Sequence, residues 1–314
     1  MADFFQISAA ERLDALNAVA DISGLPPHLL EKDIWVVWSL HQLFAGPYAE
    51  HLVFKGGTSL SKAYGVIRRF SEDVDMTYDI RAIAGDLVGD SDAPLPTTKS
   101  QEKKWSKEIR ARLSDWVATE IMPRLKQALD LNGLPAIVRA EDDKVFIDYV
   151  PLVTGTGYVS PAVMLEFGAR STGEPSESRV IRCDAAAFLE AVEFPTATPQ
   201  VMRAERTFWE KATAIHVFCA QGTFRGGDRF ARHWHDLTRL DAAGFAGGVR
   251  ATLDRVPAAR QGVRKMPSLY SAENRGRVSA AGIDVFAPKS WTTRVVTCKT
   301  PECARTPWSA SPPR

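Results

Sequence analysis

The sequence predicts an α+β protein, a mixed sheet with helices, whose C-terminal part is a helical lobe. In the first 195 residues, short segments with the alternating pattern of strands are interspersed with segments of helical periodicity. After residue 200 the apolar residues recur at helical spacing. A chain of 314 residues with 45% hydrophobic content can bury a substantial core, and this length favours two domains. We therefore expect a core over residues 1–195, a helical lobe over residues 196–286 and a loosely ordered tail over residues 287–314.

Helix and strand patterns alternate in the first hundred residues. Residues 27–44, PHLLEKDIWVVWSLHQLF, carry apolar side chains at helical spacing and predict a helix packed on a core. HLVFKGG, residues 51–57, indicates a short buried strand that ends at the glycines. SLSKAYGVI, residues 59–67, favours a helix, and EDVDMTY, residues 72–78, alternates as a half-buried strand does. A loop containing Pro, Asp and Ser is expected near residues 89–98.

The rest of the chain predicts a long helix, three strands and two more helices. The long helix is expected over residues 99–131. The strand candidates KVFIDYVPL, AVMLEFGAR and SRVIRCD follow, and the last two helices are expected over residues 202–220 and 228–244. The tail is rich in Thr, Pro, Ser and Arg and has no periodicity, so we expect little order there.

Composition narrows the class of protein. No apolar run approaches the roughly 18 residues needed to span a bilayer, so we expect a cytoplasmic protein without membrane contact. The four cysteines show no CxxC spacing, which excludes a zinc knuckle or redox motif of that kind. Residues 1–200 hold 20 Lys+Arg against 29 Asp+Glu, whereas residues 201–314 hold 19 against 9. This asymmetry suits a polyanionic partner and bound metal cations, and ordinary surface charge is the alternative.

Two aspartates in the strand predicted at residues 72–78 can bind a divalent metal ion. Asp73 and Asp75 are two residues apart, so both carboxylates point to the same face of a strand. Mg²⁺ (or Mn²⁺) prefers oxygen ligands and commonly lies between carboxylates and substrate phosphates. An EF-hand loop is excluded because Tyr78 stands where that loop needs glycine. The alternative is a strand whose acidic side chains are only solvated.

The residues before the second predicted helix can bind phosphate. Gly56 and Gly57 let backbone N–H groups approach a ligand, and Thr58 and Ser59 can cap a helix whose N-terminus attracts anions. Lys55 precedes the glycines instead of following them, so the P-loop pattern is absent. The alternative is a tight turn that needs glycine for steric reasons. Beside a strand with two aspartates, however, such a turn would place a triphosphate next to metal ions, which makes these five residues candidates for NTP binding.

Three motifs resemble those of a known family. FKGGTSLSKAYGVIRRFSEDVDM resembles the signature of the AbiEii/AbiGii toxin family, nucleotidyltransferases of the DNA polymerase β-like superfamily. ERTFWEKATAIH resembles the family's Glu-Lys helix, RHWHDL resembles its Arg-plus-Asp helix, and EKDIWVVWSL also fits. The likeness covers roughly residues 25–245, and the tail resembles nothing in the family. The residues that match are Gly56, Gly57, Arg69, Ser71, Asp73, Asp75, Glu210, Lys211, Arg232 and Asp236.

The resemblance implies a polymerase β-like fold and metal-dependent transfer of nucleotides from an NTP to an acceptor. It implies the toxin of a bacterial toxin–antitoxin or abortive-infection module, an RNA acceptor with tRNA favoured, and a separately encoded antitoxin. It also places Arg69 and Ser71 in the NTP-binding motif and assigns Lys211 to the triphosphate. Two other functions stay open: modification of a protein hydroxyl, including self-modification at Ser71, and an NTP-binding interaction module without catalysis.

Three more charged residues lie in apolar surroundings in the sequence. Glu166 interrupts an apolar strand and is a candidate third carboxylate for metal binding, with a salt bridge to Arg170 or another cation as the alternative. Lys211 lies amid apolar residues, where a lysine stem that covers apolar surface is the alternative to phosphate contact. Asp236 can position Lys211 or the base, unless it pairs with Arg232 four residues earlier.

A basic cluster falls on the long helix expected over residues 99–131. Lys103, Lys104, Lys107 and Arg110 are spaced so that several of them share one helix face. Such a cluster can contact nucleic-acid phosphates, and a solvated helix face is the alternative.

Overall fold

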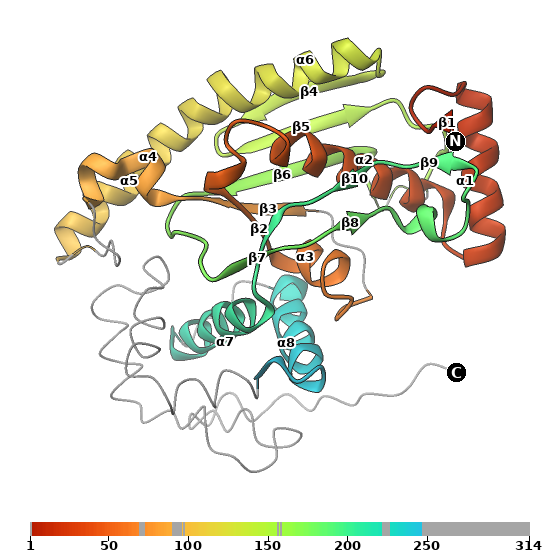
Figure 1. Ribbon diagram of the computed structural model, residues 1–314. Helices are drawn as coiled ribbons and strands as arrows, with labels where there is room; N and C mark the ends of the chain where they lie inside the picture. The colour runs from red at the N-terminus through yellow and green to blue at the C-terminus, as the bar shows by residue number, and fades with distance from the viewer. Residues whose placement is uncertain are drawn as a thin grey trace.

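The computed structural model of the protein contains a mixed sheet surrounded by helices (Figure 1). The α+β class predicted from the sequence is confirmed. Arg69, Ser71 and the tail expected at residues 287–314 lie outside the residues that the structure describes. The described residues are 2–68, 73–89, 96, 98–155, 157, 159–221 and 227–246, without the side chains of 99, 216–221 and 227–230. Among them, no helix combines the length and the apolar character that a membrane span requires.

Within the described residues, the main sheet has seven strands in the order β4-β5-β6-β3-β2-β11-β7. The β6/β3 and β2/β11 neighbours run parallel and the others antiparallel. The strands are Ala136–Glu141 (β4), Lys144–Tyr149 (β5), Ala162–Gly168 (β6), Asp73–Tyr78 (β3), Leu52–Lys55 (β2), Gln200–Met202 (β11) and Ser176–Ser178 (β7). Two small sheets pair Ala2–Asp3 (β1) with Val192–Glu193 (β9) and Ile181–Arg182 (β8) with Thr196–Ala197 (β10).

The helices include those expected at residues 27–44, 202–220 and 228–244. The long helix expected at residues 99–131 is α5, a π-helical turn at Val117–Ile121 and α6 in succession. Two short 3-10 helices are Ala49–His51 and Asp184–Ala187. The α-helices are Ala9–Ser23 (α1), Pro27–Phe44 (α2), Gly56–Lys62 (α3), Ile80–Val88 (α4), Lys99–Trp116 (α5), Met122–Asn132 (α6), Ala204–Gln221 (α7) and Gly227–Ala242 (α8).

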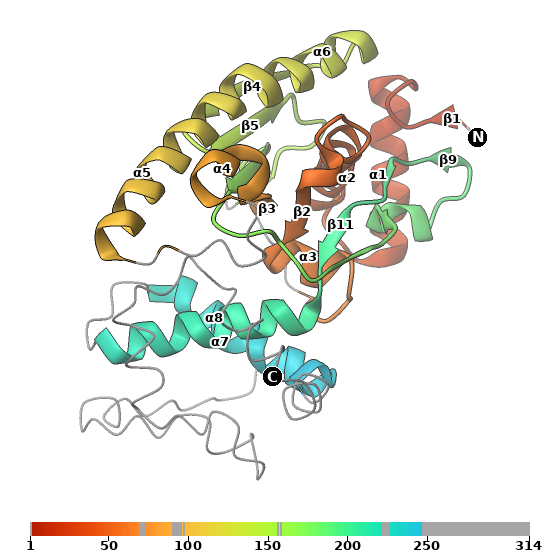
Figure 2. The same ribbon diagram turned by 60° about the vertical axis from the view of Figure 1, so that its left-hand side comes forward.

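The two faces of β3 have different environments because side chains alternate along a strand. Val74 and Met76 are fully buried, in one core with apolar residues of α2, α5 and α6. Asp73 and Asp75 therefore point to the opposite face. Figures 1 and 2 show α5 and α6 on one side of the sheet and α7 and α8 on the other, next to α3. The sheet thus separates the packed core from the side on which the aspartates lie.

A second apolar cluster attaches α7 and α8 to α3. Leu60 of α3, Phe208 of α7 and Leu240 of α8 are among its fully buried members. One strand of the main sheet, β11, lies just before α7 and pairs with β2. The sheet therefore includes residues beyond 195, and the boundary predicted there stays a prediction.

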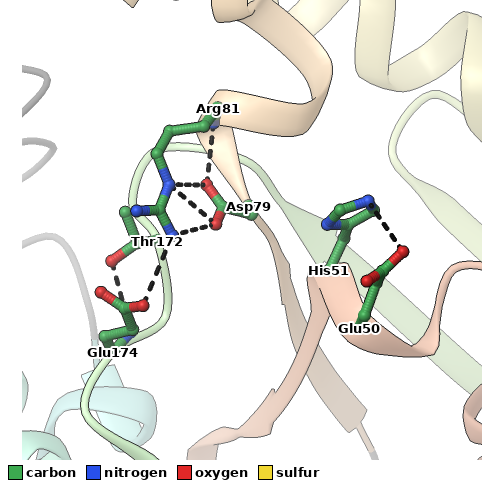
Figure 3. Close-up of polar contacts among 6 residues, drawn as sticks. All are labelled: Glu50, His51, Asp79, Arg81, Thr172 and Glu174. Carbon is green, nitrogen blue, oxygen red and sulfur yellow. Dashed lines mark hydrogen bonds and ion pairs between the residues drawn. The ribbon is translucent and has the colours of Figure 1, made fainter. Parts of the chain in front are cut away.

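The end of β3 is fixed by a cluster of polar contacts (Figure 3). Asp79 accepts a hydrogen bond from the backbone N–H of Arg81 at 2.8 Å, which caps α4. The Arg81 guanidinium donates to both carboxylate oxygens of Asp79 and lies 3.4 Å from a Glu174 oxygen. The Asp79 backbone N–H donates to the carbonyl of His51 just before β2. These contacts hold the carboxyl end of the strand that carries the two aspartates.

Buried charges join α2 to α3. The Lys62 ammonium lies 2.7 Å from Asp33 and 2.8 Å from Asp184, and the second Asp33 oxygen accepts from the backbone N–H of Asp184. Lys62 and Asp33 are buried, whereas the Asp184 side chain is 54% exposed. Burial lowers the pKa of Lys62, but the two carboxylates outweigh burial and the pKa is raised. The C-terminal end of α3 is therefore fixed by a buried ion pair.

We expect Lys62→Met to lower the free energy of unfolding by about 3–5 kcal/mol, because it leaves the buried Asp33 carboxylate without its cation. Chemical denaturation measures this change. Asp184→Asn is the matched control, and a loss below about 1 kcal/mol is expected because that partner is half exposed. Equal losses in both variants would contradict a buried pair centred on Asp33.

Candidate active site

Three neighbouring strands bring three predicted residues to one place. In the sheet register, Asp75 of β3 lies directly opposite Lys55 of β2 and directly opposite Glu166 of β6. Residues directly opposite one another on adjacent strands share a sheet face. Asp73, two residues before Asp75, lies on the same face. The structure therefore gathers a lysine and three carboxylates from separate parts of the sequence.

The glycine turn contacts the aspartate strand. Gly56 has a φ of +79°, a left-handed conformation that favours glycine. A Cβ atom at Gly56 would lie 2.0 Å from Asp75 Oδ2, far inside van der Waals contact. The backbone can turn from β2 into α3 beside Asp75 only because this residue has no side chain. Both ends of the motif that starts at the glycine pair thus meet at one carboxylate.

The predicted helix cap at Thr58 and Ser59 is wrong. α3 begins at Gly56, with Lys55 at the N-cap and no capping side chain. Thr58 and Ser59 therefore lie inside the helix and are buried. The Thr58 hydroxyl donates to the backbone carbonyl of Asp73, and the Ser59 hydroxyl donates to the carbonyl of Gly56 at 2.9 Å. Their hydroxyls attach the helix to β3 and close its first turn.

Asp75 lies in an electrostatically strained environment. The pKa of Asp75 is raised to about 6, mainly by burial and also by the negative charges of the nearby Glu166 and Asp73. The positive charges of Lys55 and Lys211 act in the opposite direction. Lys211 belongs to α7, so this helix brings its ammonium close enough to act on the β3 carboxylate. A buried carboxylate beside two others favours a bound cation.

Glu166 has a partner other than the metal predicted for it. Its carboxylate lies 3.0 Å from the Lys144 ammonium of β5, and both side chains are partly exposed. The hydrogen bond to Glu166 raises the pKa of Lys144. The alternative of a cationic partner is therefore what the structure shows, with Lys144 in place of Arg170. A metal-binding role for Glu166 stays a prediction and would require it to leave Lys144.

The acidic residues do not form a complete metal cage. Among the residues that the structure describes, no group of three or more His, Cys, Asp or Glu side chains is arranged to hold a metal ion. Mg²⁺ usually binds one or two carboxylates together with substrate phosphates and water, not an all-protein cage. Two carboxylates on one face of β3, beside a glycine turn, fit that pattern.

A buried ion pair holds Lys211. Its ammonium lies 3.0 Å from the Asp236 carboxylate of α8, which is 0% exposed, while the lysine side chain is 11% exposed. A lysine that only covers apolar surface would place its charged end in water. The Asp236 carboxylate therefore positions the Lys211 ammonium, which is one of the roles that the sequence predicts for Asp236. The His235 ring lies 3.3 Å from the other oxygen of this carboxylate. Glu210, the neighbour in the matched motif, instead pairs with Arg206 at 3.2 Å.

Sequence reasoning missed Lys144 as a member of this site. Lys144 begins β5 and lies opposite Glu166 in the register. Its only signal in the sequence is a position at the start of KVFIDYVPL, on the same strand face as Phe146. The pairing of two strands fixes its role, and no local pattern carries that information.

We expect Gly56→Ala to abolish nucleotide transfer and to destabilise the protein by about 2–4 kcal/mol, because it combines strained backbone with a clash. Gly65→Ala is the matched control, since Gly65 has a φ of +62° but nothing within 4 Å of an added Cβ. This control should lose only about 1 kcal/mol and keep its activity. Thermal unfolding and a transfer assay measure both effects, and equal behaviour of the two variants would refute the close approach to Asp75.

The sequence model of one family matches most of this chain. The family is described as the nucleotidyl transferase AbiEii toxin of type IV toxin–antitoxin systems, and the match covers residues 38–302. The chain therefore belongs to the AbiEii nucleotidyltransferase toxin family, as its motifs predicted. The match also includes residues 287–302, the part of the tail in which no likeness was expected.

The solved structures similar to this chain include a nucleotidyltransferase toxin. It is MenT4, a nucleotidyltransferase toxin from Mycobacterium tuberculosis H37Rv, with 18% sequence identity and a TM-score of 0.37. The similarity covers 67% of this chain and 59% of the MenT4 chain, so the match spans less than two thirds of that protein. Comparison with curated proteins returns no match.

Proposed function

We propose that this chain is a metal-dependent nucleotidyltransferase, the toxin of a toxin–antitoxin module, which transfers nucleotides from an NTP to an RNA acceptor. The observation that carries the proposal is the contact of the Gly56 turn with Asp75, on a sheet face shared with Lys55 and Glu166. This arrangement puts the start of α3 next to paired carboxylates. Membership of the AbiEii family supports the same reaction.

The aspartates suit the metal ion that this reaction requires. Asp73 and Asp75 would hold Mg²⁺ or Mn²⁺, which supplies charge neutralisation for displacement at the α-phosphorus. The site suits a metal ion because the Asp75 carboxylate is buried beside the like charges of Asp73 and Glu166, which a bound cation would neutralise. Glu166 is the candidate third ligand and would exchange Lys144 for the metal.

Cationic side chains and the glycine turn would bind the triphosphate. Lys211, held by Asp236, and Lys55 both act electrostatically on Asp75, so their charges lie near the bound phosphates in this scheme. The backbone N–H groups of the turn at Gly56 and Gly57 would add hydrogen bonds to the phosphates. The family motif assigns Arg69 and Ser71 to the nucleotide as well, although both lie outside the described residues.

The acceptor and the partners in this proposal are those that the family resemblance implies. An RNA acceptor, with tRNA favoured, fits a toxin that acts in the cytoplasm and is opposed by a separately encoded antitoxin. The presence of Asp73, Asp75 and Lys211 together favours an active enzyme over an idle NTP-binding module, because a module that had lost its catalysis would be free to lose these residues.

One experiment tests the proposed reaction. The purified protein is incubated with each labelled NTP, Mg²⁺ and total RNA, and the label is followed into RNA and into protein. Label in RNA that disappears with a chelator is expected. Label in protein would instead favour hydroxyl modification, and no incorporation with any NTP would refute a transferase.

A further inference from the structure

The basic cluster on α5 forms an exposed stripe. Lys103, Lys104, Lys107 and Arg110 are all exposed, and Lys103, Lys107 and Arg110 recur at four and three residues along the helix. In the described part of the chain, none of the four makes an ion pair. We call these four residues the basic stripe. Glu102 and Glu108 lie on the same helix, but Glu108 pairs with Arg112 and not with the basic stripe.

Arg112, further along the same helix, shows the contrast. Its guanidinium lies 2.5 Å from Asp86 of α4 and 3.0 Å from Glu108, one turn earlier on α5. This arginine attaches α5 to α4 and has a structural role. The basic stripe has no such role, which leaves its charges available to a polyanion.

A groove runs beside the basic stripe, between α5 and the carboxyl end of β6. Trp105 and Arg110 of α5 line one side, and Gly168 and Arg170 line the other. Trp105 is half-buried and Arg170 is exposed, so an aromatic ring and two guanidinium-bearing residues face a shared space. Glu102 and Asp143 also line the groove.

The groove leads toward the candidate active site. Gly168 lies two residues after Glu166 on β6, and Glu166 lies directly opposite Asp75. At about 3.3 Å per strand residue, the end of the groove is roughly 7 Å from Glu166. The groove therefore ends near the carboxyl end of β6, two residues along the strand from Glu166.

The chemistry of this surface fits single-stranded RNA. Lysine and arginine bind phosphates, an aromatic ring stacks on a base of any kind, and carboxylates accept hydrogen bonds from base amino groups. We propose that the basic stripe and the adjoining groove bind the single-stranded end of the RNA acceptor, with phosphates along the stripe and a base against Trp105. This inference rests on the proposed transfer to RNA and adds the surface that holds the acceptor.

Binding measurements test the surface without the reaction. Fluorescence anisotropy with the full chain and a short labelled single-stranded RNA, without NTP or divalent metal, gives the affinity at several salt concentrations. The combined variant Lys103→Ala, Lys107→Ala and Arg110→Ala should bind at least tenfold more weakly. Each lost phosphate contact removes about 0.7 from the slope of log affinity against log salt, so the slope should fall by about 2.

The matched control removes the same charge elsewhere. Arg124, Lys126 and Arg182 are exposed basic residues away from the groove, and their combined alanine variant should bind RNA as the parent does. Arg170→Ala should weaken single-stranded RNA binding several-fold. Trp105→Leu should weaken single-stranded RNA but not a blunt RNA duplex, whose bases are not free to stack. Melting curves show which variants fold. If Trp105→Leu does not fold, Arg170→Ala still tests whether the groove binds single-stranded RNA.

Distinct outcomes separate this inference from the proposed function. An unchanged salt slope in the stripe variant, or an equal loss in the control variant, would overturn the surface. Transfer of label into a protein that requires the stripe would also overturn it, since the occupant would not be RNA. A reduced slope in a protein that transfers no nucleotide would support the surface and refute the proposed function.

Discussion

Asp75→Ala should reduce nucleotide transfer at least a thousandfold while the protein stays folded. The carboxylate lies against the Gly56 turn, and its loss would remove a metal ligand and thus the neutralisation of charge in the transition state. Asp73→Ala should behave alike, because both carboxylates lie on one face of β3. Single-turnover kinetics with saturating NTP measures the loss, and full activity in either variant would refute the site.

Stability measurements distinguish the loss of a metal ligand at Asp75 from a loss of folding. Burial and like charges raise the pKa of Asp75, so the ionised carboxylate is held at a cost in the folded protein. Asp75→Asn, which keeps the shape and removes the charge, should melt no lower than the parent when metal is absent. Asp148→Ala is the matched control, since this carboxylate lies on the same sheet face but pairs with Arg139. The control should keep its activity.

The local part of this site could be predicted from the sequence. Period-2 alternation predicts that Asp73 and Asp75 share a face, and helical periodicity predicts α2 at the bounds that the structure has. Each of these inferences depends on neighbours within one element. The β4 strand gave no such signal, because at the edge of the sheet its side chains alternate only between half-buried and exposed.

The long-range part could not be predicted because it depends on strand pairing. Proximity in the sequence favours Arg170 as a partner of Glu166, but Arg170 lies beyond the end of β6 at Gly168. The neighbouring strand supplies a closer partner, and Lys144 lies 3.0 Å away. The helix cap predicted at Thr58 is wrong for a different reason, because α3 begins two residues earlier, at Gly56. The phosphate-binding role of Lys211 was predicted only from the family resemblance.

Lys211→Ala should lower kcat/KM for the NTP by roughly two orders of magnitude, about 2.7 kcal/mol at 1.36 kcal/mol per decade. The ammonium reaches the site from α7 and acts on Asp75, so it can contact phosphate as a point charge. Lys211→Arg should recover part of the activity, because the charge survives while the shape does not. Steady-state kinetics with varied NTP measures these changes.

Because Lys211 pairs with the buried Asp236, Lys211→Ala can lose activity through lost stability as well as through lost phosphate binding. A double variant separates these two causes. Removal of Lys211 takes its ammonium away from a fully buried carboxylate, which should cost about 3–5 kcal/mol of stability. The double variant Lys211→Met and Asp236→Asn removes both charges and should regain most of that stability. If Lys211 binds phosphate, the double variant stays as inactive as Lys211→Ala. If the lysine only neutralises Asp236, activity should return with stability, and Lys211 would then have no part in binding the nucleotide.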